Sequence, residues 1–396
     1  MGKLNVKKLA VITGFLVLGL AGCAVNPVTG QSEIALVSDR EAIAIGQQQY
    51  VPSQQMQGGQ LLIAPELSAY VEEVGQRLAR ASGVNLPYEF VVLNNGTPNA
   101  WALPGGKIAI NRGLLVALEH ESELAAVLAH EIAHAAARHG AKRLERDMLT
   151  QGVLAVASIG TEGSALGQEV IGYASRGAQL LGLKYSRDAE READFYGMQF
   201  MTDAGYSPQG AVTLQEKFVA MKGGAAAASQ DWLASHPTSI ERVENNRGRA
   251  RELMARKPTA THFGTAEYRT ALTRVTEAAP AYEAYEEASA LLEVGSHDAA
   301  ISSINQALSL VSDEAQFHGL RGAIRMAQKR YGDAVTNFDR AISFDPAYFA
   351  YYLHRGAAKS KQGKRSEAKQ DLERSMQLLP TAQAQELLQE ISAVPR

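Results

Sequence analysis

The sequence predicts an α+β fold that is mostly helical and carries a small sheet, followed by an all-α array of repeated helix pairs. Apolar residues at helical spacing and two short strand-like segments predict the first part, over residues 61–256. A repeat of 34 residues predicts the second part, over residues 281–396. A length of 396 residues also favours two folded units over one.

The composition is that of an ordinary globular protein. Hydrophobic residues make up 46% of the chain and charged residues 20%, which favours neither a disordered chain nor one with many membrane spans. The formal net charge is -3, and no stripe of Lys and Arg with interleaved aromatic residues stands out, so we expect no nucleic-acid partner. The basic cluster within residues 242–257 is interpreted as the solvated face of a helix.

Residues 1–22 have the pattern of a secretion signal. Lysines precede a short apolar stretch, and small residues then lead to Cys23, the one cysteine of the chain. The segment LAGC (20–23) resembles a bacterial lipobox, in which the cysteine receives lipid and becomes the mature N-terminus. This resemblance implies a lipid anchor on Cys23. By the sorting rule of enteric bacteria, Ala24 implies the outer membrane, at its periplasmic face. The alternative is a plain signal peptide or a short membrane anchor.

Residues 23–60 are expected to form a tether with one short helix around residues 39–50, because they are rich in Asn, Pro, Gly and Gln and weakly periodic. Helical spacing then predicts a helix over residues 67–81. The segments 88–93 (YEFVVL) and 107–111 (KIAIN) are typical of strands.

One long helix is expected over residues 114–140, with Glu121 and Glu123 in its first turn and Gly140 at its C-terminal cap. Residues 149–183 are rich in Ala, Gly and Leu, but charged residues interrupt every apolar run. No stretch therefore reaches the roughly 18 residues of a membrane span. We interpret this segment as a buried helical hairpin.

Further helices are expected over residues 188–204, from residue 208 onward, and over residues 239–256. Residues 257–280 are interpreted as a linker.

Residues 281–396 repeat with a period of 34. The positions that keep this spacing are Ala288, Gly322 and Gly356; Ala300, Ala334 and Ala368; Ile304, Phe338 and Leu372; and Ala307, Ala341 and Ser375. Small residues where helices cross, with Pro346 and Pro380 closing successive units, are typical of tetratricopeptide repeats. We expect about three repeats, a capping helix over residues 382–393, and a concave groove that binds peptides or partner proteins.

The segment HEIAH (130–134) places two histidines at positions i and i+4 of the long helix. They lie about 40° apart around the helix axis, so both imidazoles point at one spot. Neutral imidazole is a good zinc ligand. Glu131 lies beside this spot, where it can hold a water molecule on the metal and take its proton. The apolar surroundings indicate burial, which is costly for polar groups without a partner such as a metal.

A catalytic zinc site needs a third protein ligand and an open fourth position. The long helix does not supply that ligand, because His139 lies about 180° from His130 and is expected at the surface. The helix over residues 188–204 offers Glu190 and Asp194 on one face. Glu190 can bind the metal while Asp194 bonds the far nitrogen of a ligand histidine. The alternative is a salt-bridged surface helix.

These residues resemble the BepA/HtpX-type zinc metallopeptidases, a family related to the CAAX prenyl proteases. The resemblance spans about residues 30–250. Its motifs are NPVTG (26–30), NAWALPGGKIAINRGLL (99–115), ELAAVLAHEIAH (123–134), SRDAEREADFYG (186–197) and SHP (235–237). It implies a zincin-type, gluzincin-like metalloprotease domain with one zinc ion per chain. Signal, protease and repeats together resemble the BepA-like lipoprotein form, with a shorter array and without the membrane helices of the HtpX branch.

The resemblance also implies roles for single residues. His130, His134 and Glu190 would bind the zinc ion, Glu131 would act as general base, and Asp194 would support a ligand. The expected substrate-binding edge strand consists of Asn99, Ala100, Trp101, Ala102, Leu103 and Pro104. The open backbone groups of such a strand would pair with an extended polypeptide with little sequence preference.

His236 is a further catalytic candidate. It precedes Pro237 ahead of a new helix and so could reach the open position of the zinc ion. There it would bind the metal in a resting state or donate to the oxyanion in the transition state. The alternative is a residue that packs at the start of the helix.

Together these patterns predict a zinc-dependent endopeptidase of the bacterial cell envelope that hydrolyses peptide bonds of misfolded or stalled envelope proteins. Polypeptides would be its substrates, and partner proteins of the envelope would bind the repeat array. The alternative function is that of a chaperone-like assembly factor for outer-membrane proteins, which acts mainly through the array.

Overall fold

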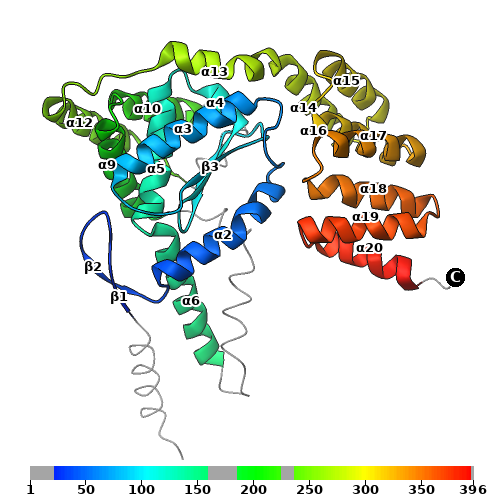
Figure 1. Ribbon diagram of the computed structural model, residues 1–396, viewed down its shortest axis with the longest axis horizontal. Coiled ribbons are helices and arrows are strands. Elements are labelled where there is room, and N and C mark those ends of the chain that lie inside the picture. The colour runs from blue at the N-terminus through cyan, green and yellow to red at the C-terminus, as the bar shows by residue number, and fades with distance from the viewer. Residues whose placement is uncertain (1–21, 159–184, 224–235, 394–396) are drawn as a thin grey trace, which may run out of the picture.

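The computed structural model describes residues 22–158, 185–223 and 236–393. The signal sequence expected at residues 1–22, apart from its last residue, and most of the hairpin expected at residues 149–183 lie outside these ranges. Among the described residues, no helix has both the length and the apolar character needed to cross a membrane. Figure 1 shows an α/β region joined through helix α13 to a stack of helices at the C-terminal end.

Three short strands form the sheet of the α/β region. They are β3 (Glu89–Leu93), β4 (Ala100–Leu103) and β5 (Lys107–Asn111). β5 lies in the middle, parallel to β3 and antiparallel to β4. The strands expected at residues 88–93 and 107–111 are confirmed, and β4 lies at an edge of the sheet.

One face of the sheet packs against two helices, α3 (Pro65–Ser82) and α5 (Glu121–Ala136). Side chains alternate across the pleat, so Phe90 and Ile108 point into this core together with apolar residues of both helices. The predicted helix at residues 67–81 is thereby confirmed as α3. This core fixes α5, the helix that carries the HEIAH motif, behind the sheet.

The other face of the sheet carries α2 (Asp39–Met56). Its Tyr50 meets Trp101 of β4 edge-on, with ring centroids 6.3 Å apart. A hairpin of β1 (Gly22–Val25) and β2 (Ser32–Ala35) precedes α2. The expected tether is therefore largely folded, and its helix is longer than predicted, because the residues after Tyr50 continue to pack in helical register.

Helices α9 (Arg187–Asp203), α10 (Gln209–Gly223) and α12 (Ile240–Arg256) complete the α/β region. α9 and α10 pack on α5, and α12 packs on both of them. The side chains of Ser186 and Ser239 cap α9 and α12 by accepting backbone N–H bonds three residues ahead. The helices predicted in these segments are confirmed.

The prediction of one helix over residues 114–140 is wrong. The chain instead forms α4 (Arg112–Ala117), α5 and α6 (His139–Ser158). Arg138 has a φ of 61°, in the left-handed region that commonly terminates a helix. Glycine is the usual residue at such a position, so the arginine gave no signal of the break.

The interpretation of residues 257–280 as a linker is also wrong. They contain α13 (Thr265–Glu277), which buries Tyr268, Leu272 and Val275. α13 packs on α3, α4 and α5. The spacing of i, i+4 and i+7 is the pattern of an amphipathic helix and was present in the sequence.

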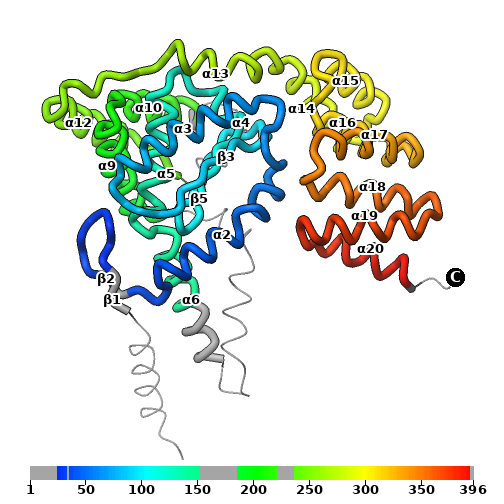
Figure 2. Tube along the Cα trace, viewed as in Figure 1, coloured from blue at the N-terminus to red at the C-terminus, as the bar shows by residue number. Residues whose placement is uncertain are grey.

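Three helix pairs and a final helix form the C-terminal array. They are α14 (Ala279–Glu293) with α15 (His297–Leu310), α16 (Ala315–Ala327) with α17 (Tyr331–Phe344), α18 (Phe349–Lys361) with α19 (Arg365–Leu378), and α20 (Ala382–Ala393). The small residues expected at helix crossings, Ala300, Ala334 and Ala368, are fully buried. Figure 2 shows the pairs stacked in chain order. The repeats and the capping helix are confirmed.

The array touches the α/β region through α14 and α16. The side-chain amide of Gln316 donates to the carbonyl oxygens of Gly58 and Asn94, at 2.9 and 2.8 Å. The Arg112 guanidinium lies 3.4 Å from the centre of the Tyr282 ring, a cation–π contact. The two parts therefore share specific polar contacts in addition to the connection through α13.

Candidate metal centre

Helix α5 holds His130, Glu131 and His134 in a buried position. The Nε2 atoms of the two histidines lie 3.0 Å apart, as their spacing of four residues on one helix predicts. Burial lowers the pKa of His134 well below its usual value, so this imidazole is neutral.

Helix α9 brings Glu190 to the two histidines. Its Oε1 lies 3.4 Å from His134 Nε2, and its Oε2 lies 3.6 Å from His130 Nε2. Burial raises the pKa of Glu190, but the neighbouring histidines, His236 foremost, outweigh this and hold the pKa well below its usual value. A neutral imidazole and an ionised carboxylate are the forms in which these groups bind zinc.

His236, which lies just before α12, completes the group. Its Nδ1 lies 3.0 Å from Glu190 Oε1 and 3.3 Å from His130 Nε2. One ligand atom from each of His130, His134, Glu190 and His236 lies within 4.8 Å of the others. Zinc bonds of 2.0–2.1 Å in a tetrahedron set the ligand atoms roughly 3.4 Å apart. The atoms of His130, His134 and Glu190 lie 3.0 to 3.6 Å apart, close to that value, so these three residues can hold zinc.

Glu131 lies beside these four residues. Both of its carboxylate oxygens are buried and have no hydrogen-bond partner among the described residues. The nearby His236 Nε2 is 3.5 Å from Glu131 Oε1. Burial raises the pKa of Glu131, against the opposing effect of His236 and His130. Buried polar atoms are nearly always satisfied, so the orphaned oxygens indicate a missing polar partner at this position.

Asp194 and Arg242 lie behind the ligands. Asp194 Oδ1 is 3.0 Å from His130 Nδ1, the nitrogen that faces away from the cluster. The Arg242 guanidinium donates to both oxygens of Asp194 at 2.7 Å and lies 2.9 Å from Glu190 Oε2. Arg242 is only 6% exposed, so its interpretation as part of a solvated helix face is wrong.

His139 also lies at the centre, contrary to expectation. Its Nδ1 is 2.8 Å from His134 Nδ1, and the residue is buried. The prediction of a surface position assumed that α5 continues through residue 139. The left-handed turn at Arg138 redirects the chain, so that α6 begins with His139 against His134.

Tyr185 stacks on the other side of His134, with ring centroids 3.9 Å apart and planes 19° apart. Burial raises the pKa of its hydroxyl. Tyr185 directly precedes the SRDAEREADFYG motif, and no spacing rule pointed to it. Arg242 and His139 were expected at the surface, but both are buried at the centre.

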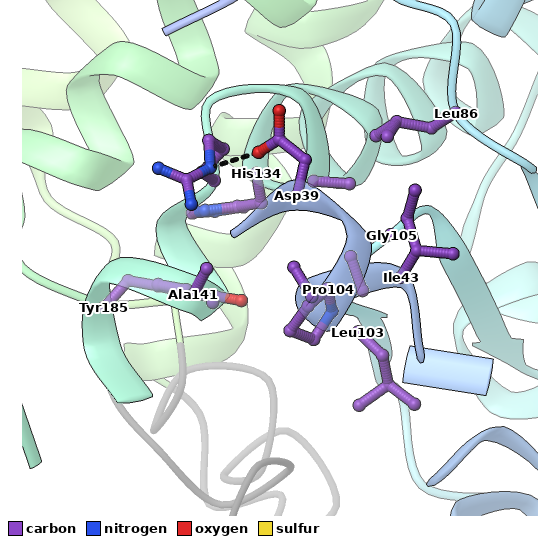
Figure 3. A pocket seen from close by; sticks show the side chains of 14 residues that line it. Asp39, Ile43, Leu86, Leu103, Pro104, Gly105, His134, Ala141 and Tyr185 are labelled. Atoms are coloured by element: carbon purple, nitrogen blue, oxygen red, sulfur yellow. Dashed lines mark ion pairs between the residues drawn. The ribbon is translucent and has the colours of Figure 1, made fainter. Parts of the chain in front are cut away.

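The expected edge strand reaches the metal centre at one end. β4 comprises Ala100 to Leu103, flanked by Asn99 and Pro104, and among the described residues it pairs with β5 alone. Leu103 and Pro104 line a small cavity together with His134 and Tyr185. Figure 3 shows this cavity between α2, the end of β4 and the start of α6.

The remaining predicted site residues lie elsewhere. Trp101 points to α2 on the far face of the sheet, where it is buried. Cys23 lies in β1, in the N-terminal hairpin.

Comparison with known proteins agrees with this arrangement. Residues 65–250 match the model of peptidase family M48, and residues 322–363 match a tetratricopeptide repeat. The first match contains α3, the sheet and all residues of the centre.

Individual relatives cover part of the chain. The beta-barrel assembly-enhancing protease of Yersinia pestis is 30% identical over 240 residues, which are 59% of this chain and 49% of that protein. The mitochondrial metalloendopeptidase OMA1 of Schizosaccharomyces pombe is 36% identical over 177 residues, which are 44% of this chain and 50% of that protein. The beta-barrel assembly-enhancing protease of Escherichia coli is 29% identical over 221 residues, 53% of this chain and 45% of that protein. The chain thus spans about half the length of these relatives.

Proposed function

We propose that the chain is a zinc metalloendopeptidase with its centre on α5 and α9, since residues 65–250 match the model of peptidase family M48. The observation that carries the proposal is the convergence of His130, His134, Glu190 and His236, whose ligand atoms lie within 4.8 Å of one another. We assign His130, His134 and Glu190 as the zinc ligands.

The proposed mechanism divides the work between zinc and the protein. A bound zinc ion would supply an acidified water molecule and polarise the scissile carbonyl. Glu131 takes the proton from the attacking water and passes it to the leaving amine. Its two unpaired, buried oxygens favour this role. Asp194 holds the His130 ring so that Nε2 faces the metal.

We further propose that the substrate is an extended polypeptide paired with β4. The free edge of this strand ends at Leu103 and Pro104, in the cavity that His134 also lines. Backbone pairing gives affinity with little dependence on sequence. Such binding suits a protease that acts on misfolded or stalled proteins of varied sequence.

The repeat array supplies the proposed partner site. A cavity of about 460 Å³ lies between α16, α18 and the loop 94–97 that leads into β4. Tyr285, Phe338 and Tyr351 line it together with polar groups such as Asn95. Aromatic and amide side chains together suit a peptide, which offers apolar side chains and backbone hydrogen bonds.

The cellular setting that we propose is the bacterial envelope. Relatives named for β-barrel assembly support a role in outer-membrane protein quality control. The lipobox-like segment ending at Cys23 supports a lipid anchor at the periplasmic face of the outer membrane. In this division, residues 1–22 are the signal, 23–60 precede the peptidase unit of residues 61–256, and residues 281–396 are the partner-binding unit.

The substitution Glu131→Gln tests the enzymatic proposal. We expect it to retain one zinc ion per chain and the fold, while casein hydrolysis falls about 100- to 10,000-fold because the base is lost. Metal analysis and a casein digest with and without chelator measure both effects. Glu119→Gln is the matched control, since Glu119 is exposed and lies outside the centre. Casein cleavage by Glu131→Gln at the wild-type rate would contradict the mechanism.

A second candidate function, chaperone-like assembly of outer-membrane proteins, is favoured by the cavity on the array. The Glu131→Gln variant separates the two. Full rescue of outer-membrane protein assembly in a strain that lacks the protein would show that binding suffices. Failure to rescue, with normal amounts of the variant, would show that peptide hydrolysis is required.

A further inference from the structure

The two histidines on α5 are supported from behind in different ways. His130 Nδ1 meets a carboxylate directly, at 3.0 Å from Asp194 Oδ1. His134 Nδ1 meets another imidazole, that of His139, at 2.8 Å. The proposed metalloenzyme mechanism uses His130, His134 and Asp194 but gives His139 no role.

The hydrogen bond between these rings determines which nitrogens carry protons. If His134 binds a metal through Nε2, its Nδ1 carries the proton and donates it. His139 Nδ1 must then be the acceptor. A neutral imidazole that accepts through Nδ1 carries its own proton on Nε2.

A carboxylate lies near Nε2 of His139, the nitrogen that carries this proton. His139 Nε2 is 3.7 Å from Glu192 Oε1. This separation is that of an ion pair rather than a hydrogen bond. Both atoms are buried, and neither has a hydrogen-bond partner among the described residues.

The N-terminal hairpin lies next to Glu192. The side chain of Asn26, at the start of the NPVTG segment, is close to the Glu192 carboxylate. Asn26 is fully buried and is itself held by Glu33, at 3.1 Å. The series of contacts therefore runs from the hairpin through Glu192 and His139 to His134.

We propose that His139 is a positioning residue that fixes the tautomer and ring orientation of the ligand His134. The nearby Glu192 carboxylate favours the tautomer of His139 that carries its proton on Nε2. This inference rests on the proposed zinc centre. It places an imidazole between a carboxylate and His134, whereas the Asp194 carboxylate meets the His130 ring directly.

The test compares His139→Phe with His139→Asn in the full chain. Phenylalanine fills the space without an acceptor, whereas the Asn side-chain oxygen can take the place of Nδ1. We expect zinc affinity, measured by competition with a chelator, to fall about 10- to 100-fold in His139→Phe. It should return most of the way to the wild-type value in His139→Asn. His297→Phe, in the distant array, is the control and should leave zinc affinity unchanged.

A second readout is the imidazole nitrogen spectrum of the zinc-loaded protein. The proton on His134 Nδ1 should be protected from exchange in the wild type and in His139→Asn, but not in His139→Phe. The thermal unfolding midpoints of the zinc-free variants report any general loss of folding.

The outcomes separate this inference from the proposed function. Wild-type protein that binds no zinc overturns the metal centre and the inference with it. Wild-type protein that binds zinc tightly, with equal affinity in His139→Phe, overturns the inference alone. Equal losses in His139→Phe and His139→Asn also overturn it, because packing rather than the hydrogen bond would then be responsible.

Discussion

Arg242 joins three parts of the candidate metal centre through one guanidinium. It pairs with Asp194 behind His130, lies 2.9 Å from Glu190 and donates to the carbonyl oxygen of Pro237 at 2.8 Å. Removing one partner of such a buried pair commonly costs about 3–5 kcal/mol, because a charge is left buried without compensation. The hydrogen bond to Pro237 holds the residue that follows His236, so the position of the His236 ring depends on Arg242.

The substitution His236→Ala tests the role of His236 at the candidate metal centre. We expect the variant to keep bound zinc, because His130, His134 and Glu190 remain, and to change the rate of casein hydrolysis. A higher rate would identify His236 as a ligand of the resting state, and a lower rate as a donor to the oxyanion. Metal content and casein rate are measured on the same preparation. An unchanged rate would leave His236 with a packing role and contradict the assignment.

At the residue scale, the sequence was informative where chemistry lies on one helix. His130 with His134, and Glu190 with Asp194, follow from a spacing of four residues. Arg242 and His139 were assigned wrongly because their surroundings depend on tertiary structure. The first reaches the centre from α12, and the second through the turn at Arg138. Neither position follows from the periodicity of a single element.

Among the elements, the close packing of α9 on α5 sets the distance between the carboxylate ligand and the two histidines. Gly197 of α9 lies against the backbone of α5. A Cβ atom at this position would be 3.0 Å from the backbone nitrogen of His130 and 3.1 Å from the backbone oxygen of Ala129. Real Cβ atoms seldom come so close, and a helix backbone cannot yield as a flexible side chain does.

Gly197→Ala should therefore push α9 away from α5. We expect a loss of about 1–3 kcal/mol in the free energy of unfolding and weaker zinc binding, because Glu190 moves with its helix. Gly248→Ala is the matched control: Gly248 lies within α12, and a Cβ there meets nothing within 4 Å. That variant should gain about 0.5–1 kcal/mol. Denaturant unfolding measures both, and equal effects would contradict the close-packing argument.

The elements themselves were largely predictable where periodicity was clear. The strands follow from alternation with a period of two residues, and α3 follows from apolar residues spaced by three to four. The helix pairs follow from the repeat of 34 residues. The failures were at boundaries. An arginine in a left-handed conformation ends α5 without the usual glycine, and α13 was overlooked although Tyr268, Leu272 and Val275 show helical spacing.

At the scale of the whole molecule, a buried polar cluster joins the array to the peptidase region. Glu314 is 2% exposed and accepts hydrogen bonds from the Tyr282 hydroxyl at 2.7 Å and from the backbone N–H of Gln316 at 2.9 Å. Gln316 in turn binds Gly58 and Asn94. Burial raises the pKa of Glu314, and these hydrogen bonds only partly oppose it.

The raised pKa gives a pH dependence with a definite sign. The protonated carboxyl is favoured in the folded state, so its contribution to stability is complete below about pH 4.5 and is lost as pH rises through the folded pKa. Glu314→Gln keeps polar atoms in place without the charge. We expect its free energy of unfolding, relative to that of wild type, to rise as pH increases from 4 to 7. Each unit by which the folded pKa of Glu314 exceeds the unfolded pKa contributes about 1.4 kcal/mol. Glu293→Gln, at an exposed position, should show no such trend, and a parallel pH profile for Glu314→Gln and wild type would contradict the argument.

The loop before β4 and the turn after it lie in two different cavities. Thr97 lines the cavity shared with the repeat array, and Pro104 lines the one beside His134. Pro104 is seven positions after Thr97, a length of chain that spans roughly 23 Å at most. A polypeptide bound by the array and paired with β4 would reach the metal centre at a fixed distance from the bound segment. The length of β4 would then set the distance between the segment bound by the array and the cleaved bond. The length of the product would depend on that distance rather than on the sequence at the cleavage site.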